Sequence, residues 1–352
     1  MALLPSGSFT SEAWAPLMKR PEDHNLSRLW SLVLEELSRG LKAAVTHLAI
    51  NEGIPPHQEG HGGGENVRRS PSSLRMLHGD FGPDHDDDGD DAAGEPSEED
   101  LGRAFWVATK QNGIHQTWAP RWTMFSRGNI KEKARVLAFG RPAGAARTGG
   151  TTTWAVDLYA GIGYFTFSYA ALGMRVLCWE INPWSVEALR RGARANRWAV
   201  RVVRGRDLER PLDEVVAAGG EQILVFLESN ERAAARVRRL QKAGLARDIA
   251  HVNCGFLPTS EPVWRPAWEM TRGSAGAWLH LHENVGVGDL EARRRSIQAM
   301  FDGWAAALTE EGEAREARVE HIEQVKTFAP GVWHCVYDVR IVQKRSGIAS
   351  IE

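Results

Sequence analysis

Short apolar runs of strand length alternate with stretches of helical length from residue 154 onward. This alternation predicts a largely parallel sheet, because parallel strands need long connections, which are usually helices. The expected helices cover about residues 164–172, a stretch opened by Asn182-Pro183, and residues 231–242 and 290–308. The expected strands are AVDLYA, RVLCWEI, VRVV, ILVFLE, IAHVNCGF and AWLHLHENV.

The last two strands are predicted to run antiparallel if they pair directly. VEHIEQVKTF and GVWHCVYDVRIV are joined only at Ala329-Pro330, which is too short for a parallel crossover. A mostly parallel sheet that ends in an antiparallel hairpin is the architecture of the Rossmann-like methyltransferases. We therefore predict this α/β fold for residues 154–345.

The N-terminal part of the chain changes composition twice. Apolar residues recur at helical spacing between Leu29 and Leu48, which predicts a helical region within residues 1–52. Residues 53–100 have little apolar surface, and we expect a largely disordered acidic linker there. Docking of its internal apolar residues on the folded body stays open; these are Leu74, Met76, Leu77 and Phe81. The last part of the linker, residues 84–100, holds ten carboxylates and no Lys or Arg. The rest of the chain has 43 basic against 35 acidic residues, so the body of the protein is basic.

Residues 101–140 are predicted to form a small region with a β-hairpin and a helix. AFWVATKQNGIHQTWAP contains two strand-like runs on either side of Asn112-Gly113. This pair favours a tight hairpin turn with positive φ. The glycine-rich stretch 141–153 then separates this region from the α/β region.

A glycine-rich turn follows the first strand of the α/β region. In DLYAGIGYFT, Asp157 ends the strand, and Gly161 and Gly163 lie in the turn that opens the next helix. The pattern differs from the dinucleotide motif GxGxxG, because Thr166 stands where the third glycine belongs. Asp157 would repel a pyrophosphate and attract the cationic sulfonium and ammonium groups of S-adenosylmethionine. Glu180, at the tip of the next strand, is suited to accept hydrogen bonds from both ribose hydroxyls.

Six ordered segments resemble one family of tRNA-modifying enzymes. They are WAPRWTMFSRGNIKEK, DLYAGIGYFT, CWEINPWSVEALRR, HVNCGFLPTS, HLHENV and VKTFAPGVWHCVYDV. The chain is similar to the tRNA wybutosine-synthesising protein 2 family in its fungal form, a relative of the tRNA guanine-37 N1-methyltransferases. The resemblance implies a Rossmann-like class I S-adenosylmethionine-dependent transferase fold with a small N-terminal α+β region. It also implies transfer of the 3-amino-3-carboxypropyl group to carbon 7 of 4-demethylwyosine at position 37 of phenylalanine tRNA, with methylthioadenosine as by-product.

The resemblance assigns cofactor contacts residue by residue. The Ser and Lys of the family's MFSxGNxxEK motif fall on Ser126 and Lys133, which places residues 101–140 beside the cofactor. The family's acidic residue after the second strand falls on Glu180. A Gly-Asp-Asn after the third strand has an imperfect counterpart at residues 205–207, which puts Asp207 near the adenine.

Two features depart from the pattern of the family. Residues 223–244 look like an added strand and helix, and the start at Met1 is abrupt, as expected of a shortened sequence. Two alternatives stay open, namely a tRNA guanine-37 N1-methyltransferase and a catalytically inactive tRNA-binding relative. The intact Gly161, Gly163 and Glu180 favour an enzyme.

A missing motif predicts which arm of the cofactor reacts. Amine methyltransferases of this fold commonly use a D/N-P-P-aromatic turn after the fourth strand, where this chain has Asn253-Cys-Gly-Phe-Leu-Pro258. We expect Ser126 and Lys133 to turn the γ-carbon of the methionine arm toward the base, although Lys133 also fits a solvated helix residue. Asn253 and Glu283 are the candidate catalytic residues, with Glu283 as the candidate general base. The alternative role for Glu283, which we favour, is structural hydrogen bonding to a loop.

Metal, disulfide and membrane chemistry are not expected. His280 and His282 share one face of a strand, but no third ligand stands at a suitable spacing. The three cysteines form no CxxC pair, which fits a reducing cytoplasm. No run approaches about 18 apolar residues, and the start lacks the features of a signal peptide. We therefore expect a cytoplasmic monomer.

Clustered arginines predict an RNA partner, which the resemblance specifies as the anticodon loop of phenylalanine tRNA. Seven arginines lie between Arg190 and Arg206, and basic residues stripe the predicted helix between Arg232 and Lys242. Phosphate binding and a solvated helix face explain them equally well. Trp118, Arg121 and Trp122 are candidates for stacking on an extruded base, and a plain core role fits the tryptophans as well.

Overall fold

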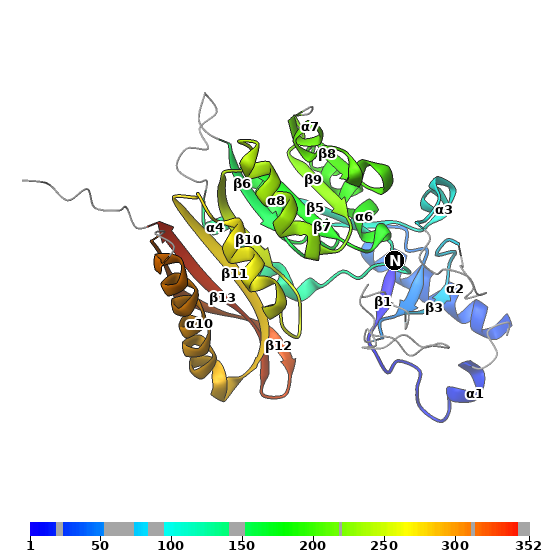
Figure 1. Cartoon of the computed structure of the whole chain (residues 1–352). Helices are drawn as coiled ribbons and strands as arrows, with labels where there is room; N and C mark the ends of the chain where they lie inside the picture. The colour runs from blue at the N-terminus through cyan, green and yellow to red at the C-terminus, as the bar shows by residue number, and fades with distance from the viewer. Residues whose placement is uncertain are drawn as a thin grey trace, which may run out of the picture. The chain divides into compact units, whose positions relative to one another are not determined.

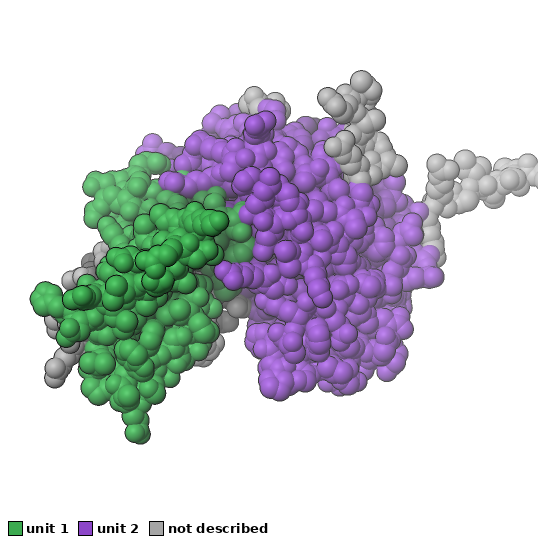
Figure 2. Space-filling view, turned by 180° about the vertical axis from the view of Figure 1, so that it is seen from behind, with its two compact units in different colours: residues 1–109, 117–125, 183–188 green, residues 110–116, 126–182, 189–352 purple. Residues whose placement is uncertain are grey.

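The computed structural model describes residues 1–18, 24–52, 74–83, 95–140, 152–217, 220–310 and 314–343. They belong to two compact units, which are coloured separately in Figure 2. The smaller unit comprises Met1–Thr109, Thr117–Phe125 and Pro183–Ala188, and the larger unit comprises Lys110–Gln116, Ser126–Asn182 and Leu189–Glu352. Within the described residues, none of the helices has both the length and the apolar character needed to cross a bilayer.

An eight-stranded sheet forms the centre of the larger unit (Figure 1). Its order is β12-β13-β11-β10-β6-β7-β9-β8. The six strands from β8 to β11 in this order run parallel, and β13 pairs antiparallel with both β11 and β12. This confirms the predicted Rossmann-like α/β fold and its terminal hairpin. The strands are β6 (Thr153–Asp157), β7 (Arg175–Glu180), β8 (Val200–Val203), β9 (Ile223–Leu227), β10 (Asp248–Cys254), β11 (Gly276–Gly286), β12 (Arg315–Ala329) and β13 (Val332–Gln343).

One face of this sheet packs on helices in an apolar core. Ala233, Val237 and Leu240 of α8 are fully buried against it, at the spacing of one helix face. The α-helices that follow the small hairpin are α4 (Ile130–Ala138), α5 (Thr166–Ala171), α6 (Pro183–Ala195), α7 (Leu212–Ala217), α8 (Ala233–Lys242), α9 (Trp264–Met270) and α10 (Leu290–Glu310). Short 3-10 turns are η1 (Arg127–Asn129), η2 (Gly205–Glu209), η3 (Asn230–Arg232), η4 (Glu261–Val263) and η5 (Val287–Asp289).

The other face of the sheet carries a row of buried polar side chains beneath α4 and α5. Arg135 of α4 forms an ion pair with Asp338 of β13. His280 of β11 lies 2.7 Å from Asp338 through its Nδ1, and its Nε2 lies 3.0 Å from Nδ1 of His251 on β10. Tyr169 of α5 packs its ring against both imidazoles. We call Arg135, Asp338, His280 and His251 the polar row.

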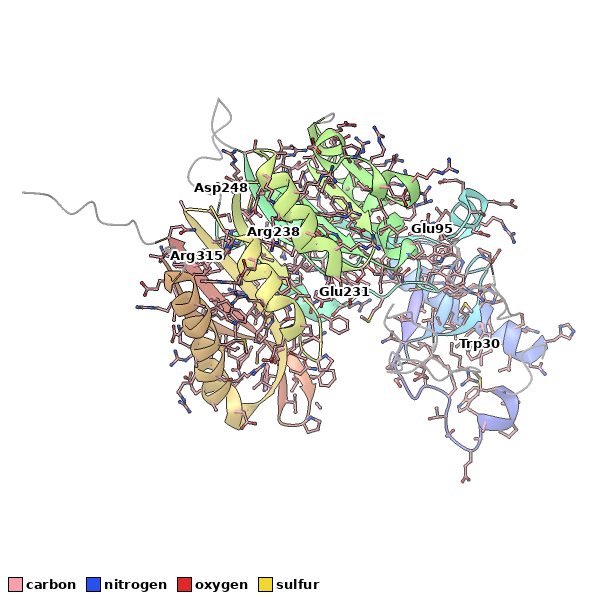
Figure 3. The ribbon with its side chains drawn as sticks, in the orientation of Figure 1. Trp30, Glu95, Glu231, Arg238, Asp248 and Arg315 are labelled. Atoms are coloured by element: carbon pink, nitrogen blue, oxygen red, sulfur yellow. The ribbon has the colours of Figure 1, made fainter. Side chains whose placement is uncertain are left out.

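At one edge of the sheet, two strands that follow each other in the chain have exchanged the expected places. β8 precedes β9 in the sequence, but β9 pairs with β7 and β8 pairs only with β9. The segment ILVFLE is thus the strand beside β7, and VRVV forms the edge of the sheet. Figure 3 labels Asp248 and Arg315, the first residues of β10 and β12. They lie at the end of the sheet that is opposite the carboxyl ends of the parallel strands.

The smaller unit contains a three-stranded sheet and an amphipathic helix. The sheet has the order β1-β2-β3, with β1 parallel and β3 antiparallel to β2. The buried face of α2 carries Leu26, Trp30 and Leu34, and Figure 3 labels Trp30. The elements are β1 (Ala2–Leu4), α1 (Ala15–Met18), α2 (His24–Leu41), β2 (Leu48–Ile50), β3 (Arg75–His78) and α3 (Glu98–Arg103).

Two expectations for this unit need correction. The helix predicted up to Leu48 ends at Leu41, and Leu48 begins β2. Two segments of the predicted linker are ordered, since Arg75–His78 pairs with β2 and a capping box at Ser97 starts α3. The remaining linker residues, 53–73 and 84–94, lie outside the described residues, as does most of the 141–153 break.

The predicted hairpin is confirmed. β4 (Val107–Gln111) and β5 (Ile114–Trp118) form a two-stranded sheet. Asn112 and Gly113 connect them with φ values of 51° and 80°, as a two-residue turn that matches the strand twist requires. The hairpin brings Gln111 and Gln116 beside α4, where both contact Lys133.

Candidate active site

The turn after β6 is held by buried hydrogen bonds at the carboxyl end of the sheet. Asp157 is fully buried and accepts hydrogen bonds from N and Oγ1 of Thr166, at 3.0 and 2.8 Å. Asn253, near the end of β10, donates from Nδ2 to Oδ1 of Asp157 at 2.9 Å. Because β7 and β10 flank β6 on opposite sides, this turn stands where parallel sheets bind their ligands.

Asp157 positions the turn and does not offer a free carboxylate to a ligand. Thr166, Asn253 and, at 3.4 Å, the N–H of Tyr159 donate to it. Burial raises the pKa of Asp157, and the hydrogen bonds from Asn253 and Thr166 act in the opposite direction. The structure therefore gives Asp157 a positioning role in the turn, and the attraction of a sulfonium by its charge stays a prediction.

Glu180 ties the tip of β7 to the glycine turn. Its Oε2 accepts the N–H of Gly161 at 2.8 Å, and its Oε1 accepts the N–H of Asn182 at 2.8 Å. Burial raises the pKa of Glu180, while the two backbone donors favour the carboxylate. The structure thus brings Asp157, Gly161 and Glu180 together, as the sequence predicts.

Gly163 has a backbone conformation and a packing environment that exclude a side chain. Its φ is 91°, and an added Cβ would lie 2.6 Å from Cζ of Phe167. We expect Gly163→Ala to destabilise the protein by about 1–3 kcal/mol, measured by urea unfolding. Gly173→Ala is the matched control, because Gly173 has a φ of 85° with nothing within 4 Å of the added Cβ. Equal losses in the two variants would exclude the clash with Phe167 as a cause.

Tyr164 joins the glycine turn to the segment that carries Ser126 and Lys133. The N–H of Ser126 donates to the hydroxyl of Tyr164 at 3.0 Å. The ammonium of Lys133 lies 5.7 Å from the centre of the Tyr164 ring, within cation–π range. The sequence analysis did not select Tyr164, although it directly follows Gly163 in the glycine motif.

Lys133 is buried, which contradicts the alternative of a solvated helix residue. Only 4% of its surface is exposed. Its Nζ donates to Oε1 of Gln111 at 2.5 Å and to Oε1 of Gln116 at 2.7 Å. Burial lowers the pKa of Lys133 to about 8. These amides stabilise the ammonium without neutralising it, so the site retains a positive charge that suits an anionic group.

Asp207 does not lie with the other predicted cofactor residues. It belongs to η2, after the edge strand β8, and its half-exposed side chain faces Arg210 at 3.4 Å. The residues at the end of β9, the strand beside β7, are Glu228, Ser229 and Asn230. Asn230 donates from Nδ2 to the carbonyl of Leu158 at 2.8 Å. The end of β9 therefore adjoins the site, and the end of β8 does not.

Both carboxylate oxygens of Glu283 are engaged by side-chain donors. Arg293 donates to its two oxygens from Nε at 2.7 Å and from a terminal nitrogen at 2.6 Å. Thr259 adds a hydrogen bond to Oε1 at 2.9 Å. The arrangement fastens the loop after β10 to β11, whereas Asn253 contacts the glycine turn through Asp157.

The strand histidines have separate partners. His280 belongs to the polar row, and Nδ1 of His282 lies 2.9 Å from Nε2 of His334 on β13. Burial lowers the pKa of His334 to about 4, and the nearby Lys326 acts in the same direction. Among the residues that the structure describes, no three His, Cys, Asp or Glu side chains are arranged to hold a metal ion.

The tryptophans proposed for base stacking pack within the smaller unit. Trp118 stacks on Phe125 with ring centres 4.5 Å apart, and Trp122 stacks on Trp184 at 4.8 Å. Arg121 donates to the carbonyl of Gly82 at 3.4 Å. These contacts agree with the packing role that the sequence analysis left open for the two tryptophans.

The basic residues of α8 divide into two groups. Arg236 is half-buried and forms an ion pair with Glu228 at the end of β9. Arg238 and Lys242 are exposed, and Figure 3 labels Arg238 on this helix. Arg236 therefore has a structural partner, and the exposed members remain suited to phosphate contacts.

Comparison with known proteins identifies one matching family and several similar sequences. Residues 107–228 match the family described as the TRM5/TYW2 methyltransferase domain. Over 300 residues the chain is 43% identical to tRNA wybutosine-synthesizing protein 2 of Schizosaccharomyces pombe, which covers 85% of this chain and 62% of that protein. Over 319 residues it is 35% identical to the protein of the same name from Saccharomyces cerevisiae, with 85% and 60% covered. The chain thus spans less than two thirds of the length of these relatives.

A solved structure shares the fold. The crystal structure of P. horikoshii TYW2 in complex with MeSAdo matches with a TM-score of 0.52 and 16% sequence identity. The match covers 92% of this chain and 86% of that chain.

Proposed function

We propose that this chain, which belongs to the tRNA wybutosine-synthesising protein 2 family, is an S-adenosylmethionine-dependent aminocarboxypropyltransferase. It transfers the 3-amino-3-carboxypropyl group to carbon 7 of 4-demethylwyosine at position 37 of phenylalanine tRNA, in wybutosine biosynthesis. The observation that carries this proposal is the 43% identity to the Schizosaccharomyces pombe relative across 85% of the chain. The buried Lys133, beside a Tyr164 that also contacts Ser126, supports it independently.

The site offers a separate group for each part of the co-substrate. Glu180 is suited to the ribose hydroxyls, and Asn230 at the end of β9 replaces Asp207 as our candidate near the adenine. Ser126 and Lys133 are suited to the amino acid arm, because Lys133 supplies a buried positive charge for its carboxylate. Asn253 positions the turn through Asp157. Glu283 is withdrawn as the general base, since Arg293 binds both of its oxygens.

The choice between arm transfer and methyl transfer depends on which carbon of the sulfonium faces the acceptor. A sulfonium has three carbons open to attack, and the reacting one is held in line at about 3–3.5 Å from the nucleophile. MeSAdo, the ligand named for the P. horikoshii structure, is methylthioadenosine, which remains when the amino acid arm has left. That ligand supports arm transfer over the guanine-37 methylation that we retain as the alternative.

The products of a single incubation test the proposed reaction. With phenylalanine tRNA that contains 4-demethylwyosine, we expect methylthioadenosine and a base that has gained the whole aminocarboxypropyl group. Mass spectrometry of the nucleosides and of the small molecules measures both products. Formation of S-adenosylhomocysteine with a methylated guanosine would instead establish the alternative.

We further propose that the anticodon loop is the part of the tRNA that enters the site. We also propose that the protein acts as a cytoplasmic monomer. The exposed Arg238 and Lys242 supply positive charge for phosphate contacts. Sedimentation of the protein with and without phenylalanine tRNA tests the oligomeric state and the stoichiometry together.

The lowered pKa of Lys133 predicts a pH dependence of co-substrate binding. In the free protein Lys133 loses its proton near pH 8, while a bound carboxylate favours the charged form. Affinity for S-adenosylmethionine is therefore complete below pH 8 and falls above it, by up to about tenfold per pH unit. Calorimetry from pH 7 to 9.5 measures this decrease.

Lys133→Arg is the control for this pH dependence. A guanidinium stays charged throughout the range, so the variant loses the part of the pH dependence that belongs to Lys133. The groups that contact Lys133 include the amides of Gln111 and Gln116 and the ring of Tyr164. Identical pH profiles for both proteins would contradict a role of the Lys133 charge in binding.

A further inference from the structure

A second lysine contacts the same segment from the far edge of the sheet. Lys326 of β12 is half-buried and donates from Nζ to Oγ of Ser126 at 2.9 Å. Among the described residues this hydroxyl is its only hydrogen-bond partner, and no carboxylate there forms an ion pair with it. A half-buried ammonium with one neutral partner retains strong attraction for an anion.

The position of Lys326 depends on a glycine in the Ser126 segment. A Cβ added to Gly128 would lie 2.5 Å from Cδ of Lys326, so a side chain at residue 128 would displace the lysine stem. Gly128 and Ser126 both belong to the MFSRGNIKEK segment, and Lys326 belongs to VKTFAPGVW. Two distant segments are thus shaped to bring this ammonium to the Ser126 hydroxyl.

The surroundings favour an anion that belongs to the co-substrate. Ser126 is bonded through its N–H to Tyr164, which follows the glycine turn, and Lys133 lies over the Tyr164 ring. His334 is the cross-strand neighbour of Lys326 and is neutral at pH 7, because its pKa is lowered to about 4. Burial also lowers the pKa of Lys326, so the charged form gains from an anionic partner.

We propose that Lys326 and Ser126 together bind the carboxylate of the amino acid arm of S-adenosylmethionine. Lys326 is then a positioning residue that fixes the far end of the arm, so that the γ-carbon and not the methyl group meets the acceptor. This inference rests on the proposed function. An RNA phosphate has the same charge, but the link through Ser126 and Tyr164 to the glycine turn favours the carboxylate of the co-substrate.

Three ligands distinguish the contribution of the carboxylate to binding from that of the rest of S-adenosylmethionine. S-adenosylmethionine has the complete arm, decarboxylated S-adenosylmethionine lacks only the carboxylate, and methylthioadenosine lacks the arm. In Lys326→Met we expect affinity for S-adenosylmethionine to fall about 10- to 100-fold, as for the loss of a charged hydrogen bond. Affinities for the other two ligands should stay within about twofold, since neither reaches Lys326 with an anion. Calorimetry with each ligand forms a double-mutant cycle between Lys326 and the carboxylate.

Two control variants accompany this measurement. Lys326→Arg keeps a cation and should recover part of the preference for S-adenosylmethionine over its decarboxylated form. Lys42→Met removes an exposed lysine that directly follows α2 and should bind all three ligands like the unmodified protein. Thermal unfolding of each variant verifies that it is folded before binding is compared.

The outcomes separate this inference from the function on which it rests. An equal loss of affinity for all three ligands in folded Lys326→Met would give Lys326 a merely structural role and overturn the inference. Unchanged affinity for S-adenosylmethionine, with weaker and less salt-dependent tRNA binding, would assign the lysine to a phosphate and also overturn it. If the unmodified chain binds neither S-adenosylmethionine nor methylthioadenosine, the proposed function fails as well.

Discussion

Replacing Asp338 by alanine is expected to lower the free energy of unfolding by about 3–5 kcal/mol, the range for breaking a buried ion pair. Asp338 is 1% exposed and accepts hydrogen bonds from two nitrogens of Arg135, while His280 contacts it at 2.7 Å. Burial raises the pKa of Asp338, but its contacts with His280 and Arg135 outweigh that effect, so the pKa is lowered. Without the Asp338 carboxylate, Arg135 of α4 keeps its charge and, among the described residues, retains Glu132 as its carboxylate partner.

Urea unfolding followed by circular dichroism measures this loss. Glu320→Ala is the matched control, because Glu320 of β12 faces Arg340 of β13 at 3.5 Å with both side chains partly exposed. An ion pair of this kind contributes at most about 1 kcal/mol. If Asp338→Ala were as stable as the control, the polar row would make no net contribution to folding.

Glu180→Ala is expected to weaken S-adenosylmethionine binding by about 1.5–3 kcal/mol, the range for hydrogen bonds to a charged group. The ribose loses its acceptor, and the N–H groups of Gly161 and Asn182 lose theirs. Calorimetry on the folded variant measures the change. Glu231→Ala, at an exposed residue of η3, controls for the loss of one negative charge. Wild-type affinity in Glu180→Ala would place the ribose elsewhere.

Glu180→Gln separates the two effects of this substitution. The amide oxygen keeps one acceptor for the glycine turn but removes the charge. If the ribose contact dominates, methylthioadenosine should be weakened as much as S-adenosylmethionine, because both contain the same ribose. A loss confined to S-adenosylmethionine would instead assign Glu180 to the amino acid arm.

The strands and helices of the large sheet could be predicted because local patterns determine them. Strands with both faces covered give continuous apolar runs, and β6 is buried at all five residues. The hairpin at Asn112-Gly113 follows from the positive φ that these residues tolerate. The order of the strands could not be predicted from local patterns. VRVV and ILVFLE both have the pattern of a strand, and neither pattern shows which of them lies beside β7. Only tertiary packing places ILVFLE beside β7, and that placement excluded Asp207 from the site.

In the site, too, residues close together in the sequence could be predicted, whereas contacts between distant segments could not. Asp157, Gly161 and Glu180 were found because a strand end and a turn lie close together in the sequence. Tyr164 and Lys326 were missed, since their partner Ser126 lies 38 and 200 residues away, respectively. The burial of Lys133 had no local signal either, because the hairpin that covers it precedes the helix.

The two edges of the sheet limit its tendency to aggregate. Open edge strands carry unpaired backbone groups on which another chain can assemble, and short, charged or bulged edges discourage this. β8 has only four residues and includes Arg201. β12 is long, but its register is interrupted at three places, and its exposed residues include Arg318 and Glu320. Removing the register interruptions of β12, or replacing its charges with valine, would therefore create a template for intermolecular strand pairing.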